Sequence, residues 1–182
     1  MATFFYNLYV IKSFNKYKNI SKISGQMATS KKEMKMVREI VKDIDILKKK
    51  SDRFEFDNIS DMTINYGSDQ LIQDLLDTAD AHREECLGLA SIQIGVPKRV
   101  IIVRINNKFI PFINPTIIQK SKATYSVKES CLSLDGEREV SRHHVIKVGY
   151  TARNGKPIVK TFRGITAQII QHEIDHLNGI LI

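Results

Sequence analysis

Two histidines and a glutamate near the end of the chain are spaced for metal chemistry. The run 171–179 contains His-Glu-x-x-His, with His172, Glu173 and His176 as its fixed positions. In a helix, residues four apart project from one face, so both imidazoles could bind one metal ion. Glu173 would then lie beside the metal as a general base for its water. A buried amphipathic helix with hydrogen-bonded histidines gives the same pattern, so the motif alone leaves metal binding open.

The residues around this motif predict a helix. Ile165 and Ile169 fall on the same stripe as the two histidines, at helical spacing. Thr166 is a candidate N-cap and Gly179 a candidate C′ residue. The elements of the fold must bring a further ligand to this helix.

The third metal ligand is expected upstream of the motif. Extended zinc-protease motifs place a histidine six residues after the second one, and here that position is Ile182. The candidates are Cys131, His143, His144 and scattered acids. A thiolate is a strong ligand for Zn²⁺ or Fe²⁺, and one cysteine with two histidines leaves a fourth position for water. By itself, Cys131 also reads as a small buried residue.

The length of the chain and the distribution of its charge predict one folded domain that follows an N-terminal extension. With 182 residues the chain can form one domain with a substantial core. Half of the net charge of +8 comes from four lysines in residues 1–26, which contain no acid. We expect residues 1–30 to be an N-terminal extension, disordered or a start-site artefact, and residues 31–182 to be the catalytic domain.

The composition also argues against several classes of protein. No run approaches twenty apolar residues, and Cys86 and Cys131 are too few for a disulfide framework. No stripe of clustered Lys and Arg with interleaved aromatics indicates a specific nucleic-acid surface. The excess positive charge would attract a polyanion such as the ribosome.

Hydrophobic periodicity predicts an α+β fold. An arm with a short helix is expected within 31–53, and an amphipathic helix within 69–85. Strands are expected at 99–105, 109–114, 145–151 and 157–162, with Pro111 and Pro115 at edges or turns. Arg153-Asn154-Gly155 predicts a hairpin turn. We therefore expect antiparallel β-sheets packed around the C-terminal metal-binding helix.

Three motifs in order resemble those of the peptide deformylase family. That family has G-x-G-x-A-A-x-Q, E-G-C-L-S and H-E-x-D-H segments, and this chain has CLGLASIQ at 86–93, ESCLS at 129–133 and HEIDH at 172–176. The resemblance covers roughly residues 37–182. Cys86, Ser91 and Ser130 depart from the family pattern, which bears on substrate fit and rate more than on metal binding.

The resemblance implies a metal-dependent hydrolase that releases formate from N-formylmethionyl peptides of newly made proteins. Cys131, His172 and His176 would bind one divalent ion, Fe²⁺ in this family, with Zn²⁺ or Ni²⁺ as substitutes. Its water would attack the formyl carbon, with Glu173 as general base and acid. Gln93 and the Leu132 backbone N–H would stabilise the oxyanion.

The same resemblance implies how substrate binds. The peptide would pair in extended form with backbone near Leu87, Gly88 and Ser130. Leu87 and Ile169 would contribute to the methionine pocket. Asp175 would support the site, paired with Arg138 or Arg142. We expect a cytoplasmic enzyme that acts on nascent peptides, with transient ribosome contact and no membrane or specific nucleic-acid partner.

Three other functions share part of this pattern. A metallopeptidase would cleave unformylated peptides. A non-catalytic relative, suggested by Cys86 and Ser130, would bind metal or formylated peptide without releasing formate. A basic ribosome-binding module would bind ribosomes in a salt-sensitive way without any metal.

Overall fold

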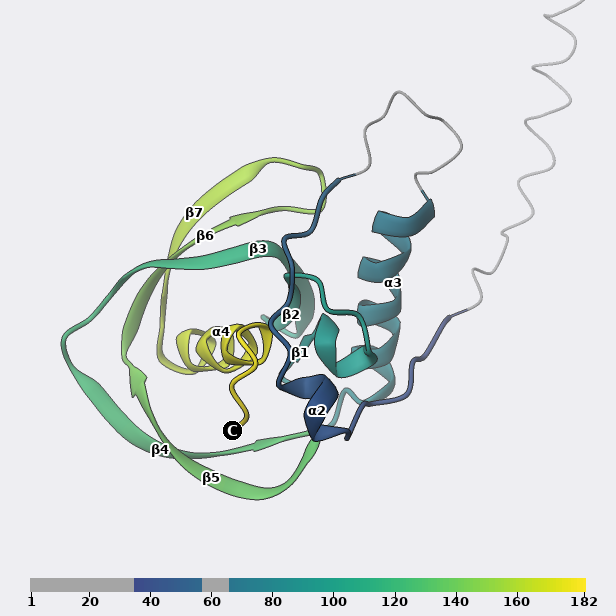
Figure 1. Cartoon of the computed structure of the whole chain (residues 1–182). Coiled ribbons are helices and arrows are strands. Elements are labelled where there is room, and N and C mark those ends of the chain that lie inside the picture. The colour runs from purple at the N-terminus through teal and green to yellow at the C-terminus, as the bar shows by residue number, and fades with distance from the viewer. Residues whose placement is uncertain (1–34, 57–65) are drawn as a thin grey trace, which may run out of the picture. The chain divides into compact units, whose positions relative to one another are not determined.

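Two antiparallel sheets and two longer helices make up the part of the chain that the computed structural model describes, residues 35–56 and 66–182. One sheet has five strands in the order β1-β2-β3-β6-β7, and β4 pairs with β5 in the other. The strands are β1 (Gly88–Ala90), β2 (Val100–Ile105), β3 (Lys108–Lys120), β4 (Thr124–Cys131), β5 (Leu134–His143), β6 (Val145–Thr151) and β7 (Pro157–Arg163). Helix α4 (Gly164–Leu177) lies between the two sheets (Figure 1). The predicted α+β class is confirmed, while the predicted extension 1–30 lies outside the described residues.

Strand β2 of the five-stranded sheet is buried on both of its faces over Val100–Val103. Successive side chains of a strand point to opposite faces. Ile101 and Val103 pack in a cluster with α4, whereas Val100 and Ile102 pack in a cluster with helix α3 (Tyr66–Ala81). The apolar run of β2 is therefore continuous because one set of its side chains packs against α4 and the other set packs against α3.

Helix α3 matches the predicted amphipathic helix at 69–85, although it begins and ends earlier. Its stripe of Leu71, Ile72, Leu75 and Ala79 is buried against the sheet. The charged residues that follow Ala81 form turns rather than a last helical turn. These turns lead the chain into β1.

The prediction that Pro111 and Pro115 mark an edge strand or a turn is wrong, because the strand that contains them is an inner strand of the sheet. Both lie within β3, which is hydrogen-bonded to β2 and β6. Pro111 pairs with Ile102 of β2, and the β6 pairing begins only at Ile113. The β3–β6 register then shifts between Ile113 and Thr116. Pro111 is tolerated because β6 does not yet pair with β3 at that position, and Pro115 is tolerated because it lies within the register shift.

The predicted hairpin between β6 and β7 is present. Gly155 has a φ of +79°, which an L side chain rarely adopts. The Ala152 amide donates to the Lys156 carbonyl at 2.9 Å and closes the turn. The predicted strands at 145–151 and 157–162 are thus confirmed to within one residue.

Helix α4 is confirmed, but one of its predicted ends is wrong. The helix begins at Gly164 with Arg163 as its N-cap, so Thr166 lies inside the first turn. Gly179 has a φ of +74° just after the C-cap, as predicted for a C′ residue. A side chain at Gly179 would collide with the Lys48 carbonyl.

The N-terminal arm, residues 35–56, is hydrogen-bonded to two separate elements of the fold. It is extended up to Asp43, which caps the one-turn helix α2 (Ile44–Leu47). The Val41 amide donates to the Gln93 carbonyl at 2.8 Å, and the Ser51 amide donates to the Leu177 carbonyl at 2.9 Å. The arm therefore contacts both Gln93, in the 86–93 motif, and the end of α4.

Within residues 35–56 and 66–182, none of the helices has the length and apolar character needed to cross a bilayer.

Candidate metal centre and active site

Cys131, His172 and His176 converge from two elements that are far apart in the sequence. Cys131 is the last residue of β4, and the two histidines lie one turn apart on α4. His176 Nε2 lies 3.2 Å from Cys131 Sγ and 3.2 Å from His172 Nε2. All three ligand atoms lie within 4.8 Å of one another.

This cluster fits a divalent cation. Two nitrogens bound tetrahedrally to Zn²⁺ at about 2.0 Å are separated by about 3.3 Å, close to the distance between the two Nε2 atoms. One thiolate and two imidazoles also form a donor set typical of zinc, iron and nickel sites. Of the upstream candidates, His143 instead contacts the Ser121 carbonyl and His144 stacks on Tyr125.

Glu129 sets the orientation of His172. Its Oε2 lies 2.9 Å from His172 Nδ1. Burial raises the pKa of Glu129, but hydrogen bonds from His172 and Arg142 outweigh it and lower the pKa to about 2. Because the ionised carboxylate can only accept, Nδ1 carries the hydrogen and Nε2 presents its lone pair to the cluster.

Arg142 in turn holds Glu129. Its guanidinium is buried and forms two contacts with the Glu129 carboxylate, at 3.0 and 2.7 Å. A third nitrogen lies 2.5 Å from Asp175 Oδ2. Of the two arginines expected to pair with Asp175, Arg142 is the one that does, while Arg138 donates to a backbone carbonyl.

The supporting role of Glu129 is a feature that the sequence analysis missed. Residues two apart share a face in a regular strand, and Glu129 lies two residues before Cys131 on β4, although the β4–β5 register shifts between them. That spacing was the available signal. Nothing in the sequence indicated that the face would meet His172.

Hydrogen-bond donors surround the sulfur of Cys131. Gln93 Nε2 lies 3.2 Å from Sγ, and the Ser133 amide lies 3.4 Å from it. The thiolate is the form of cysteine that binds metal. Gln93 is buried in the 3₁₀ helix η2 (Ser91–Ile94), and its Oε1 accepts from the Ala90 amide at 2.8 Å. Its amide group is therefore held in one orientation.

Glu173 is buried beside the cluster. Its Oε2 has no hydrogen-bond partner among the residues that the structure describes. Burial raises the pKa of Glu173 to about 7, as a general base working near neutral pH requires. Gly88 makes room for this carboxylate, because a Cβ at Gly88 would lie 2.6 Å from Glu173 Oε1.

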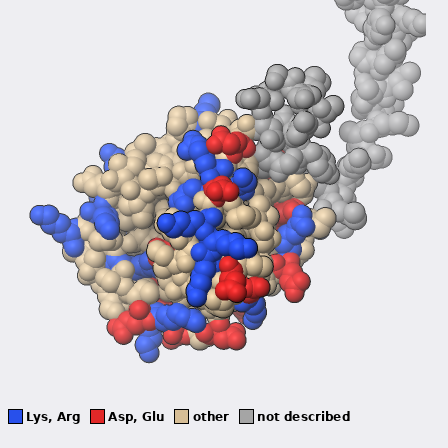
Figure 2. Space-filling view, in the orientation of Figure 1, with Lys and Arg blue, Asp and Glu red and all other residues tan. Residues whose placement is uncertain are grey.

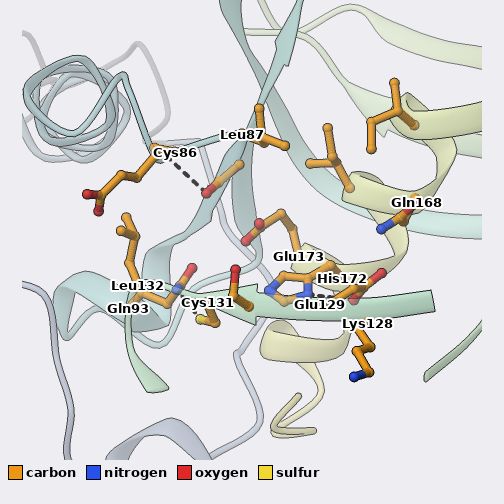
Figure 3. Close-up of a pocket in the computed structure, with 15 residues that line it drawn as sticks. Cys86, Leu87, Gln93, Lys128, Glu129, Cys131, Leu132, Gln168, His172 and Glu173 are labelled. Carbon is orange, nitrogen blue, oxygen red and sulfur yellow. Dashed lines mark hydrogen bonds and ion pairs between the residues drawn. The ribbon is translucent and has the colours of Figure 1, made fainter. Parts of the chain in front are cut away.

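A pocket of about 200 Å³ opens over these residues. Figure 3 shows Glu173 directed into it between His172 and Leu87. The exposed side chains of Leu87 and Ile165 lie at the pocket. Each predicted site residue except the deeper His176 lines this pocket: Leu87, Gly88, Gln93, Ser130, Cys131, Leu132, Ile169, His172 and Glu173.

The residues that depart from the family motif have distinct environments. Cys86 is buried in the α3 cluster, and its thiol lies 3.1 Å from the Gly88 carbonyl. Ser91 is buried and donates to the Lys98 carbonyl. Ser130 is exposed at the pocket. Cys86 and Ser130 both line the pocket, and of the two only Ser130 is exposed.

The sequence comparison decides the family. A family model described as Polypeptide deformylase matches residues 37–182. The chain belongs to the polypeptide deformylase family. A peptide deformylase from Clostridium beijerinckii is 44% identical over 147 residues, which cover 81% of this chain and 100% of the relative. One from Pelagibacter ubique is 41% identical over 131 residues, covering 68% and 75%.

Solved deformylase structures share the fold. The class I type b peptide deformylase from Acinetobacter baumannii with Met-Ala-Ser bound has a TM-score of 0.70 and 30% identity, covering 80% of this chain and 96% of that one. The Plasmodium falciparum peptide deformylase has a TM-score of 0.67 and 31% identity, covering 79% and 81%. This deformylase is thus a metal-dependent hydrolase that removes the N-formyl group from N-formylmethionyl peptides.

Proposed function

We propose that Glu173 moves the proton during deformylation, while Gln93 and Leu132 stabilise the developing negative charge. The observation that carries this proposal is the position of Glu173, buried beside the Cys131–His172–His176 cluster with Oε2 unpartnered among the described residues.

The roles of these groups follow from their chemistry. Cys131, His172 and His176 would hold a divalent cation, which would supply Lewis acidity toward the formyl carbonyl and make a water reactive near neutral pH. Glu173 takes the proton of the water at Oε2 and passes it to the departing amine. Gln93 Nε2 and the Leu132 backbone N–H donate to the oxyanion, and losing one such donor typically costs about 10²–10³ in rate.

The peptide is proposed to lie between β1 and β4. Strand β1 is the edge of the five-stranded sheet, the position at which an extended chain can add as a further strand. Leu87 and Gly88 lie on this edge of the pocket and Ser130 faces them from β4. Leu87 and Ile169 supply apolar walls for the first side chain.

We propose Fe²⁺ as the native metal. The donor set of one sulfur and two nitrogens also suits Zn²⁺ and Ni²⁺, and metal supply in the cell decides between them. Metal analysis of protein purified without oxygen tests this assignment.

We also propose that residues 31–182 act as the catalytic domain in the cytoplasm, where nascent chains leave the ribosome. Figure 2 shows Lys and Arg side chains gathered over α2 and the segment after it, with Asp and Glu beside them. Lys48, Lys49 and Lys50 are exposed at the end of α2. Such a surface would favour a transient, salt-sensitive contact with ribosomal RNA. Cosedimentation with ribosomes at rising salt tests it.

Formate release by Fe²⁺-loaded protein, kept free of oxygen, tests the residue roles. We expect formyl-Met-Ala-Ser to be hydrolysed and unformylated Met-Ala-Ser to stay intact. Glu173→Ala should retain the metal and lose deformylation by about 10²–10⁴-fold. Full activity of this variant would refute the role assigned to Glu173.

A further inference from the structure

Gln168 places a polar group in the pocket beside the apolar side chains of Leu87, Ile165 and Ile169. It lies on α4 four residues before His172, so the two side chains share a face about 6 Å apart along the helix. Gln168 lines the pocket together with Leu87, Ile165 and Ile169. A carboxamide in this position must either bind a partner or stay hydrated.

Tyr125 fixes the orientation of this carboxamide. The Tyr125 hydroxyl on β4 donates to Gln168 Oε1 at 2.9 Å. With the oxygen engaged, Nε2 is left as the free end of the amide, and Figure 3 shows it turned toward the pocket. In the described part of the chain, Nε2 donates no hydrogen bond. The pocket therefore contains a prearranged donor beside Ile165 and Ile169.

We propose that Gln168 determines specificity by selecting a first side chain that carries a hydrogen-bond acceptor at its δ position. This inference rests on the proposed function, in which the pocket takes the first side chain of the peptide. A thioether sulfur is a weak acceptor. The oxygen of methionine sulfoxide is polar and a stronger acceptor, whereas norleucine has the same length and no acceptor.

The consequence is a deformylase that accepts oxidised N-terminal methionine. A wholly apolar pocket would exclude the sulfoxide, because burying its oxygen without a donor costs free energy. Gln168 Nε2 supplies that donor. Norleucine would instead leave the amide unpaired, and sites built to donate a hydrogen bond reject analogues that lack the acceptor.

Three matched substrates test the proposal: formyl-Met-Ala-Ser and its counterparts with norleucine or methionine sulfoxide in the first position. We compare kcat/KM for the sulfoxide with kcat/KM for norleucine in the wild type and in Gln168→Leu. One hydrogen bond should change this ratio about tenfold between the two proteins. The Kd values of the deformylated peptides give the same sulfoxide-to-norleucine comparison without turnover. The relative affinity for the sulfoxide should change about tenfold between the wild type and Gln168→Leu.

Two further variants separate the donor from its surroundings. Tyr125→Phe frees the amide to rotate and should lower the ratio by a smaller factor than Gln168→Leu. Gln119→Leu makes the same chemical change on an exposed part of β3 outside the pocket and should leave the ratio unchanged.

An equal ratio in wild type and Gln168→Leu, by both kcat/KM and Kd, would overturn the proposal. If formyl peptides were not hydrolysed but the Kd ratio still changed, the proposed catalytic roles would fail and the role of Gln168 would stand. If none of the peptides bound, both would fail.

Discussion

The backbone of Gly88 lies against the carboxylate of Glu173. A Cβ built on Gly88 would be 2.6 Å from Glu173 Oε1 and 2.8 Å from its Cγ, both too close for real atoms. Gly88 also begins β1, the edge strand at the pocket. The strand proposed to bind the peptide is therefore in direct contact with the proposed general base.

Gly88→Ala should displace Glu173 and lower kcat/KM by about 10²-fold, at the lower end of what general acid–base catalysis contributes. Metal content should be unchanged, because the three atoms nearest an added Cβ belong to Glu173 and Ile169 and not to a ligand of the cluster. Gly149→Ala on β6 is the matched control, since the atom nearest its Cβ would be the flexible end of the exposed Ile118 side chain, at 3.0 Å. Formate release and metal analysis of both variants check this, and near-normal activity of Gly88→Ala would contradict it.

Glu129→Gln should weaken metal binding by about 10–100-fold, the usual effect of losing a group that orients a metal-binding histidine. The neutral amide also leaves Arg142 with Asp175 as its remaining carboxylate partner. Competition with a chromophoric chelator measures the metal affinity. Glu139→Gln, an exposed change on β5, is the control. Equal affinities in the two variants would argue against the orienting role.

Much of this site could be predicted from the sequence because its motifs are local. His172 and His176 follow from helical spacing, and the resemblance places Cys131, Gln93 and Glu173 with them. Gln168 could not be assigned a role, since only the tertiary contact with Tyr125 turns its amide toward the pocket.

The errors in the fold have similar causes. Local preference predicts an edge or turn at each proline of β3, because it does not reveal where a neighbouring strand begins or a register shifts. Thr166 was expected to cap α4, but the chain enters the helix directly from β7, so the cap falls on Arg163. The amphipathic α3 was predictable because its stripe repeats over several turns.

Cys86 should make folding stability fall at alkaline pH. Burial raises the pKa of its thiol to about 12, with the charge of Glu173 adding to the effect. From about pH 9 upward the unfolded chain loses this proton while the folded chain keeps it, so stability decreases as pH rises. Between pH 9 and 10.5 this amounts to about 2 kcal/mol at most.

Urea unfolding at pH 8 and pH 10.5 measures that decrease. Cys86→Ala should be less stable at pH 8, because it loses buried volume, yet should lose less stability on going to pH 10.5 than the wild type does. Identical losses in the two proteins would show that the thiol titrates normally.

X-ray absorption at the zinc edge, measured on protein reconstituted with Zn²⁺, tests most directly whether Cys131, His172 and His176 bind one ion. We expect one sulfur at about 2.3 Å and two imidazole nitrogens at about 2.0–2.1 Å, with the sulfur absent in Cys131→Ala. A wild-type spectrum without sulfur, or a sulfur signal that persists in Cys131→Ala, would contradict the metal centre described above.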